Sequence, residues 1–214
     1  MSLAPSVSDS RSPTLKESTG RRSQIVHHTL DVKGWIASPP SPEDARPGTC
    51  VICDAPSRPV GGRIGLHGHG VRDRQICGPP EVDSAPTWIV IACRRYQCTS
   101  CGAILTVVPR GVAPRRHYGH AAIAMALTLW AITHEPEADI RRRVCARRIS
   151  VECPARWPTL ARWARAARDA LGATSISLQE AAARAAQIAI GRAPPALRRA
   201  PRAAQAFAGG SAMP

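Results

Sequence analysis

Two pairs of cysteines have the spacing of a metal-binding motif. Cys50 and Cys53 form one C-x-x-C pair, and Cys98 and Cys101 form a second. This spacing lets one tight turn direct two thiolates at one ion, so two such turns supply four sulfurs at about 2.3 Å from a tetrahedral zinc. Because four sulfurs leave no coordination position for water or substrate, the sequence predicts one structural Zn²⁺ ion and no metal catalysis.

The neighbouring residues refine this prediction. Gly102 follows the second pair, where such a turn usually needs a residue with positive φ. The 44 residues between Cys53 and Cys98 exceed the commonest spacing of about 15 to 20, so the intervening chain must return as an inserted hairpin or loop. Four other side chains could replace one of the ligands; they are Cys77, Cys93, His67 and His69. Cys145 and Cys153 are expected to be small core residues.

Cysteine use also indicates a compartment. No apolar run of a secretory signal occurs in the first 24 residues, and the longest apolar stretch, residues 121–133, is too short to cross a bilayer. In the cytoplasm thiols stay reduced, so the eight cysteines favour metal binding over a disulfide framework. The sequence therefore predicts a soluble cytoplasmic protein without membrane contact.

The N-terminal half divides into two parts. Residues 1–46 contain Ser-Pro pairs and few large apolar groups, and predict a disordered arm in which residues 25–36, with Trp35, could dock. Residues 47–116 contain two β-like runs, at 88–92 and 103–108, separated by Gly and Pro. These residues predict a small β-rich module that carries the zinc.

The C-terminal half has helical periodicity over residues 117–191. Four helices are expected, over residues 121–133, 138–148, 158–171 and 178–190. Pro158 suits a first helical turn, and Ser177 with Glu180 has capping-box spacing. Trp157 and Trp163 are expected to anchor the core. Residues 192–214, rich in Pro, Ala and Arg, predict a disordered basic tail.

The charge of the chain points to a polyanion. The formal net charge is +14, and residues 138–214 contain 14 arginines, no lysine and four acidic residues. Such an imbalance favours nucleic acid as a partner, although nucleotide bias in the coding sequence would also produce it. Few aromatic residues are available as stacking platforms for single strands, so duplex DNA is the expected ligand.

One stretch resembles a known family. Residues 92–118, ACRRYQCTSCGAILTVVPRGVAPRRHY, combine a basic strand, a C-x-x-C-G turn, an apolar strand, a proline and a basic linker. This order resembles the zinc ribbon near the N-terminus of many insertion-sequence transposases and related short proteins. Residues 67–74, HGHGVRDR, are similar to the strand between that family's cysteine pairs, and Arg162 with Trp163 is similar to the R-W pair of its recognition helix.

The resemblance implies an α+β fold: a small β-rich zinc ribbon, then a helix-turn-helix-like domain of three to four helices that binds double-stranded DNA, with disordered termini. Arg156, Arg162 and Arg165 would enter or flank the major groove. Phosphates would be bound around the second cysteine pair and the linker, by Arg94, Arg95, Arg110, Arg115 and Arg116. Such a protein would associate with the nucleoid, as a homodimer or with a transposase.

The resemblance does not extend to catalysis. Transposases of this family use a later nuclease domain with three metal-binding carboxylates, whereas Glu180 is the single acidic residue after Leu171. We therefore expect no enzymatic activity. Two other functions compete with DNA binding: a zinc-stabilised adaptor whose basic face binds an acidic protein, and a redox protein that uses the C-x-x-C thiols.

Overall fold

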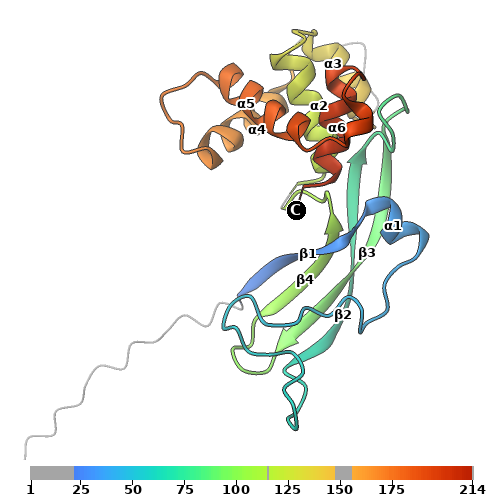
Figure 1. Ribbon diagram of the computed structural model, residues 1–214, viewed down its shortest axis with the longest axis vertical. Coiled ribbons are helices and arrows are strands. Elements are labelled where there is room, and N and C mark those ends of the chain that lie inside the picture. Colours follow the sequence, from blue (N-terminus) through green and yellow to red (C-terminus); the bar gives the residue numbers. More distant parts are fainter. Residues whose placement is uncertain (1–21, 115, 148–155, 214) are drawn as a thin grey trace, which may run out of the picture.

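The computed structural model describes residues 22–114, 116–147 and 156–213, which form an α+β fold (Figure 1). A mixed four-stranded sheet and α1 make up the β-rich half, residues 22–114, and the other helices make up the helical half, residues 116–147 and 156–213. The elements are β1 (Ser23–Asp31), α1 (Val32–Ala37), β2 (Leu66–Gly78), β3 (Thr87–Cys98), β4 (Ile104–Arg110), α2 (His120–Ala131), α3 (Glu137–Val144), α4 (Pro158–Ala170), α5 (Leu178–Gly191), the 3-10 helix η1 (Pro195–Leu197) and α6 (Arg202–Ser211).

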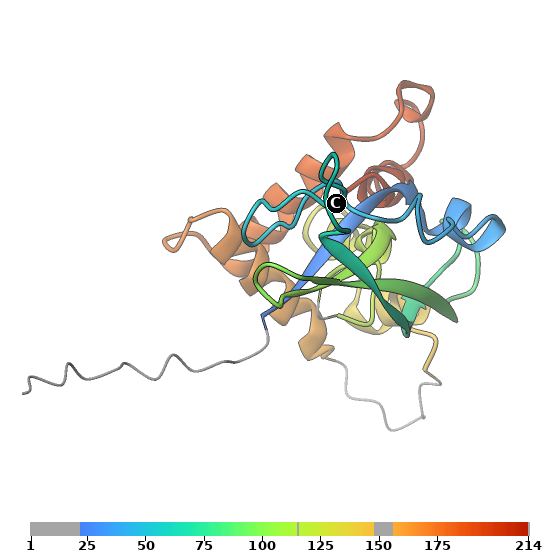
Figure 2. The same ribbon diagram turned by 90° about the horizontal axis from the view of Figure 1, so that it is seen from below.

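The strand order of the sheet is β1-β4-β3-β2. Strands β2 and β3 form a long antiparallel hairpin, β3 pairs antiparallel with β4, and β1 pairs parallel with β4. The view from below shows the strands rotated against one another, as in twisted sheets generally (Figure 2). Strand β3 contains the β-like run at 88–92 that the sequence indicates, and β4 contains the run at 103–108 except for its first residue.

One face of the sheet is covered by α1 and the segment after it. Trp35 of α1 is 2% exposed, and its indole Nε1 donates a hydrogen bond of 3.0 Å to the carbonyl of Ala92. The hydroxyl of Tyr96 donates to the carbonyl of Pro42. The prediction of a disordered arm is therefore wrong for residues 22–46, while docking through Trp35 is confirmed. The composition of this segment does not predict β1, because its partner strand, β4, lies about eighty residues further along the chain.

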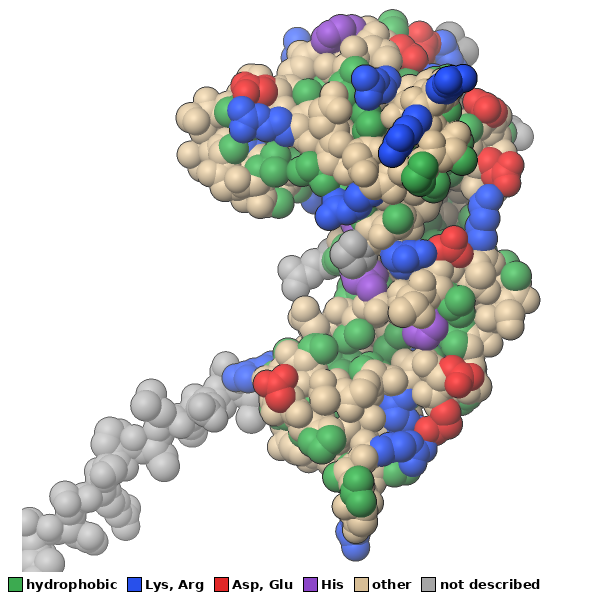
Figure 3. All heavy atoms as spheres, in the orientation of Figure 1, with side chains coloured by type: hydrophobic (Ala, Val, Ile, Leu, Met, Phe, Trp, Pro, Cys, Tyr) green, Lys and Arg blue, Asp and Glu red, His purple; other side chains and the backbone are tan. Residues whose placement is uncertain are grey.

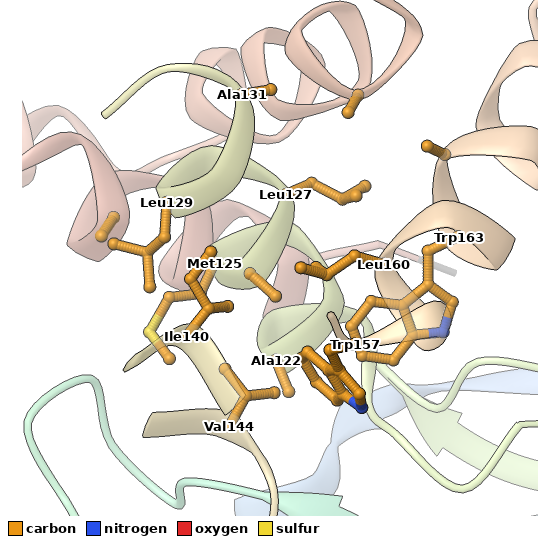
Figure 4. Packing of buried hydrophobic residues seen from close by; sticks show 14 of the residues in the cluster. Ala122, Met125, Leu127, Leu129, Ala131, Ile140, Val144, Trp157, Leu160 and Trp163 are labelled. Carbon is orange, nitrogen blue, oxygen red and sulfur yellow. The ribbon is translucent and has the colours of Figure 1, made fainter. Parts of the chain in front are cut away.

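In the helical half, α2 is central, as its apolar sequence predicts (Figure 4). Leu160 and Trp163 of α4 pack against α2 in the same cluster as Trp157. The rings of Tyr118, Trp157 and Trp163 meet edge to face, with centroids 4.9 to 6.1 Å apart. The predicted role of both tryptophans as core anchors is confirmed, as is the burial of Cys145; Cys153 lies outside the described residues.

The C-terminal segment closes the helical half. Helix α6 packs on α2 and α5, and an added Cβ at Gly209 would lie 1.7 Å from the carbonyl oxygen of Ala189. The N–H of Gly111 donates to the carbonyl of Met213 over 2.8 Å. The prediction of a disordered tail is therefore wrong for residues 192–213. Small residues look like low complexity in sequence, yet here they permit backbones to approach closely.

The four expected helices occur as α2 to α5, but a helix-turn-helix arrangement is not confirmed. Helix α3 ends at Val144 and α4 begins at Pro158, and residues 148–155 between them lie outside the described residues. Among the described helices, none combines the length and apolar character that a bilayer crossing requires.

Candidate metal centre

The four cysteines of the two C-x-x-C pairs come together in space. The sulfurs of Cys50, Cys53, Cys98 and Cys101 all lie within 4.8 Å of one another. The distance is 3.7 Å both from Cys50 Sγ to Cys101 Sγ and from Cys53 Sγ to Cys98 Sγ. Four sulfurs at about 2.3 Å from a tetrahedral ion are about 3.8 Å apart, so this cluster is a possible metal-binding site.

Each pair lies on a turn of the same construction. The N–H of Cys50 donates to the carbonyl of Ala55 over 2.9 Å, and the N–H of Cys98 donates to that of Ala103 over 2.9 Å. Positive φ angles close both turns, at Asp54 (56°) and Gly102 (70°). Aspartate is among the few residues other than glycine that adopt this conformation readily. The repeated pattern C-x-x-C-[DG]-A could have revealed Asp54 from the sequence.

The β2–β3 hairpin explains the long separation between the two pairs. Leu66, at the start of β2, pairs with Cys98, at the end of β3. Strand β2 therefore runs away from the first cysteine pair, and β3 returns the chain so that the second pair lies beside the first, as expected of an inserted hairpin. Thr99 fixes the junction, because its N–H and its hydroxyl both donate to the carbonyl of Gly65, over 2.9 and 3.1 Å.

Electrostatics within the cluster favour a cation. Burial opposes ionisation of Cys98, but the backbone N–H groups of Cys101 and Ser100 outweigh it and lower the thiol pKa to about 7. For Cys53, the backbone N–H of Ala55 favours the thiolate, yet the neighbouring thiols raise the pKa to about 12. Four sulfurs this close cannot all be ionised unless a positive charge compensates their repulsion.

The competing ligands lie elsewhere. Cys77 and Cys93 are buried, with 0% and 1% of their surface exposed, and neither belongs to the cluster of four sulfurs. His67 and His69 lie on β2 and are likewise absent from it. Within the part of the chain that the structure describes, the cluster consists of the four cysteines that the spacing predicts.

No family model matches the chain, and comparison with curated proteins and with solved structures finds no match either. The resemblance to transposase zinc ribbons therefore stays a prediction.

The arginines predicted to bind phosphate are dispersed. Arg94 and Arg95 are adjacent on β3 and so point to opposite faces of the sheet. Arg94 donates to the carbonyl of Pro40 over 3.3 Å, on the covered face. Arg110 lines a mainly apolar cavity of about 350 Å³ between α1 and α6. Arg115 lies outside the described residues.

Of the remaining predicted arginines, one is half-buried and three are exposed. Arg116 lines a groove beside the sheet, together with residues of β1 and β2. Arg156, Arg162 and Arg165 are exposed at the start and along the outer side of α4, opposite the buried Leu160 and Trp163. In the described residues, these three arginines form no ion pair with an acidic side chain. The structure thus places three of the predicted arginines at the exposed side of α4 and one, Arg116, in the groove. Arg94 contacts the covered face of the sheet, and Arg110 lines the apolar cavity.

Proposed function

We propose that this chain is a zinc-stabilised protein that binds double-stranded DNA through α4, and that it is not an enzyme. The cluster of four sulfurs carries the first half of the proposal. The second half rests on the net charge of +14 and on Arg162 and Arg165 of α4, which are exposed and form no ion pair with an acidic side chain in the described residues. Arginine and lysine side chains occur on both halves of the surface in Figure 3, with acidic side chains between them.

Zinc is the ion that this donor set fits best. Thiolates are soft ligands that select zinc or iron in tetrahedral sites, and a closed set of four cysteines is typical of structural zinc. We expect one zinc per chain by elemental analysis of purified protein. Iron, or a metal content that is unchanged when Cys98 is replaced by serine, would contradict this assignment.

The outer side of α4 is suited to a DNA groove. Helix α4 is 13 residues long, and Trp163 and Leu160 fix its inner side in the core. Arg162 and Arg165 are separated by one turn and project from the same outer side. A guanidinium can donate two hydrogen bonds to guanine in the major groove, and each such contact contributes about 1 to 3 kcal/mol of discrimination.

The experiment is a fluorescence polarisation titration with duplex DNA at about 50 and 200 mM salt. The variant Arg162→Ala with Arg165→Ala should bind about 100-fold more weakly than the wild type, from two contacts of the size given above. Its matched control, Arg198→Ala with Arg199→Ala, removes the same charge from two exposed residues of the segment before α6, and should change affinity less than threefold.

The outcomes separate the competing functions. Equal losses in the two double variants would show that net charge alone drives binding and would remove α4 from the proposal. Absent or salt-independent binding by the wild type would contradict DNA as the ligand, and would favour an adaptor that binds an acidic protein through the same basic face.

A further inference from the structure

A groove beside the sheet carries positive charge that the structure leaves unbalanced. It has a volume of about 770 Å³ and is lined from β1, β2, β3 and β4 and from the linker before α2. Its charged lining residues are Arg72, Arg74 and Arg116 against one carboxylate, Asp73, with His117 beside them. Arg72 and Arg74 are two residues apart on β2, so they stand on the same face of the strand.

Arg74 is held in place by backbone carbonyls, and among the described residues it has no acidic partner. Its Nη2 donates to the backbone carbonyls of Ala113 and Arg116, over 3.2 Å to the latter, which ties β2 to the linker. Its Nε is buried and has no hydrogen-bond partner in the described residues. Burial and, to a smaller extent, the charge of Arg72 lower the pKa of Arg74. A fixed and partly desolvated cation next to a second cation is a favourable place for an anion.

The other groups in the groove do not neutralise this charge. Cys93 is buried at its base, and burial raises the pKa of this thiol to about 11, so it is uncharged at neutral pH. Ser23 of β1 and Thr106 of β4 contribute hydroxyls to the lining. Hydroxyls and guanidinium groups are the side chains that most often contact phosphate oxygens. Arg95 pairs with Thr106 across the sheet and so stands on the same face.

The position of the groove connects it to α4. Arg116 lines this groove and also a cavity of about 410 Å³ that is lined by Trp163 and Ala166 of α4. In the space-filling view the surface is hollowed between the two halves (Figure 3). This cavity lies on the Trp163 side of α4, so Arg116 joins the groove to the inner side of that helix, and Arg162 and Arg165 lie on the opposite side.

We infer that this groove binds the phosphate chain of a nucleic acid, as a second contact separate from the outer side of α4 and with Arg72 as its accessible ligand. The inference rests on the proposed function, because it assigns the groove to the backbone of the same DNA. It adds Arg72 and Arg74 to the contacts, two residues that lie outside the set predicted from the sequence. It also removes Arg94, which faces the covered side of the sheet.

The test compares Arg72→Ala with Arg63→Ala. Both arginines are exposed, both belong to the β-rich half, and neither has an acidic partner in the described residues. In duplex DNA titrations at several salt concentrations, loss of one phosphate contact reduces the slope of log affinity against log salt by about 0.9. We expect this reduction for Arg72→Ala, and the wild-type slope for Arg63→Ala.

Calorimetry with inorganic tripolyphosphate distinguishes the groove from the proposed function. Arg72→Ala should weaken tripolyphosphate binding more than Arg63→Ala, whether or not α4 binds DNA. If Arg72→Ala and Arg63→Ala behave alike in both titrations while the α4 double variant loses DNA binding, the groove assignment is overturned and the proposed function stands. If tripolyphosphate binding depends on Arg72 but the wild type does not bind duplex DNA, the groove binds free polyphosphate and the DNA function is overturned.

Discussion

The two halves of the molecule are stabilised in different ways. The β-rich half has a core around Trp35, Tyr96 and Leu105, but most of β2 between its ends is exposed. Its two C-x-x-C turns meet at the cluster of four sulfurs, next to the hydrogen bonds from Thr99 to Gly65. The helical half surrounds α2 with other helices and buries Trp157 and Trp163. A small module with a limited core needs a cross-link, whereas a helical bundle can depend on packing. This difference predicts that the metal matters to one half far more than to the other.

The halves nevertheless share a boundary. The N–H of Gly111, directly after β4, donates to the carbonyl of Met213, after α6, over 2.8 Å. The N–H of Ala146, after α3, donates to the sulfur of Cys77 at the end of β2 over 3.4 Å. The two halves therefore differ in how strongly each depends on the sulfur cluster or on packing. Each of the following variants tests this difference.

The largest effect should come from removing Cys98 from the cluster of four sulfurs. The structural zinc that we propose for this site would contribute on the order of 10 kcal/mol, so Cys98→Ser should unfold the β-rich half. The helical half should keep its circular dichroism at 222 nm and the environment of Trp157 and Trp163. Urea unfolding followed by tryptophan fluorescence and circular dichroism measures both. Cys93→Ala is the control, because Cys93 is an equally buried cysteine of β3 outside the cluster; equal destabilisation by the two variants would contradict a metal site.

A smaller effect is expected in the helical half from Gly209→Ala. The new Cβ would lie 1.7 Å from the carbonyl oxygen of Ala189, so α6 must shift away from α5. Overpacking of this kind costs about 3 kcal/mol, and thermal unfolding should show it without any change in metal content. Gly191→Ala is the matched control, since an added Cβ there meets no atom within 4 Å. If Gly209→Ala leaves the melting temperature unchanged, the docking of α6 is wrong.

The smallest effect concerns pH at the boundary between the halves. Burial, with a contribution from His27, lowers the pKa of His120 from 6.5 to about 4. As the pH falls, His120 is protonated in the unfolded chain before it is protonated in the folded one. The contribution of neutral His120 to the free energy of unfolding is therefore fully present above about pH 6.5 and is lost as the pH falls towards 4. After allowance for incomplete burial, the loss is about 2 kcal/mol. Chemical unfolding of wild type and His120→Gln at equal metal content measures it; parallel pH profiles would show that His120 does not contribute.

The sequence predicted the elements whose signals are local. The spacing of Cys50, Cys53, Cys98 and Cys101 predicted the cluster of four sulfurs, because a C-x-x-C turn is encoded within a few residues. The apolar run of α2 and the stripe of α4 likewise predicted two helices and the burial of Trp163. The expectation of an α+β fold is confirmed on the same basis.

The sequence failed where elements distant in the chain pair with each other. Residues 23–31 lie in a Ser- and Pro-rich stretch that predicts a disordered arm, and they form β1 because β4 offers a free edge. Residues 202–211 have the composition of a disordered tail, and they form α6 because their small side chains fit against α2 and α5. In both cases, contacts with distant parts of the chain offset the conformational entropy that is lost when the segment becomes ordered. The composition of the segment does not reveal these contacts.

The sequence by itself determined which residues can bind a metal ion and that the chain is strongly basic, since ligand type and charge belong to the side chains. Only the tertiary structure decided which charges act together. It placed Arg94 and Arg95 on opposite faces of one strand, brought Arg72, Arg74 and Arg116 to one groove, and left Arg162 and Arg165 exposed on α4. Electrostatic attraction depends on distance and burial, and both are set by the fold.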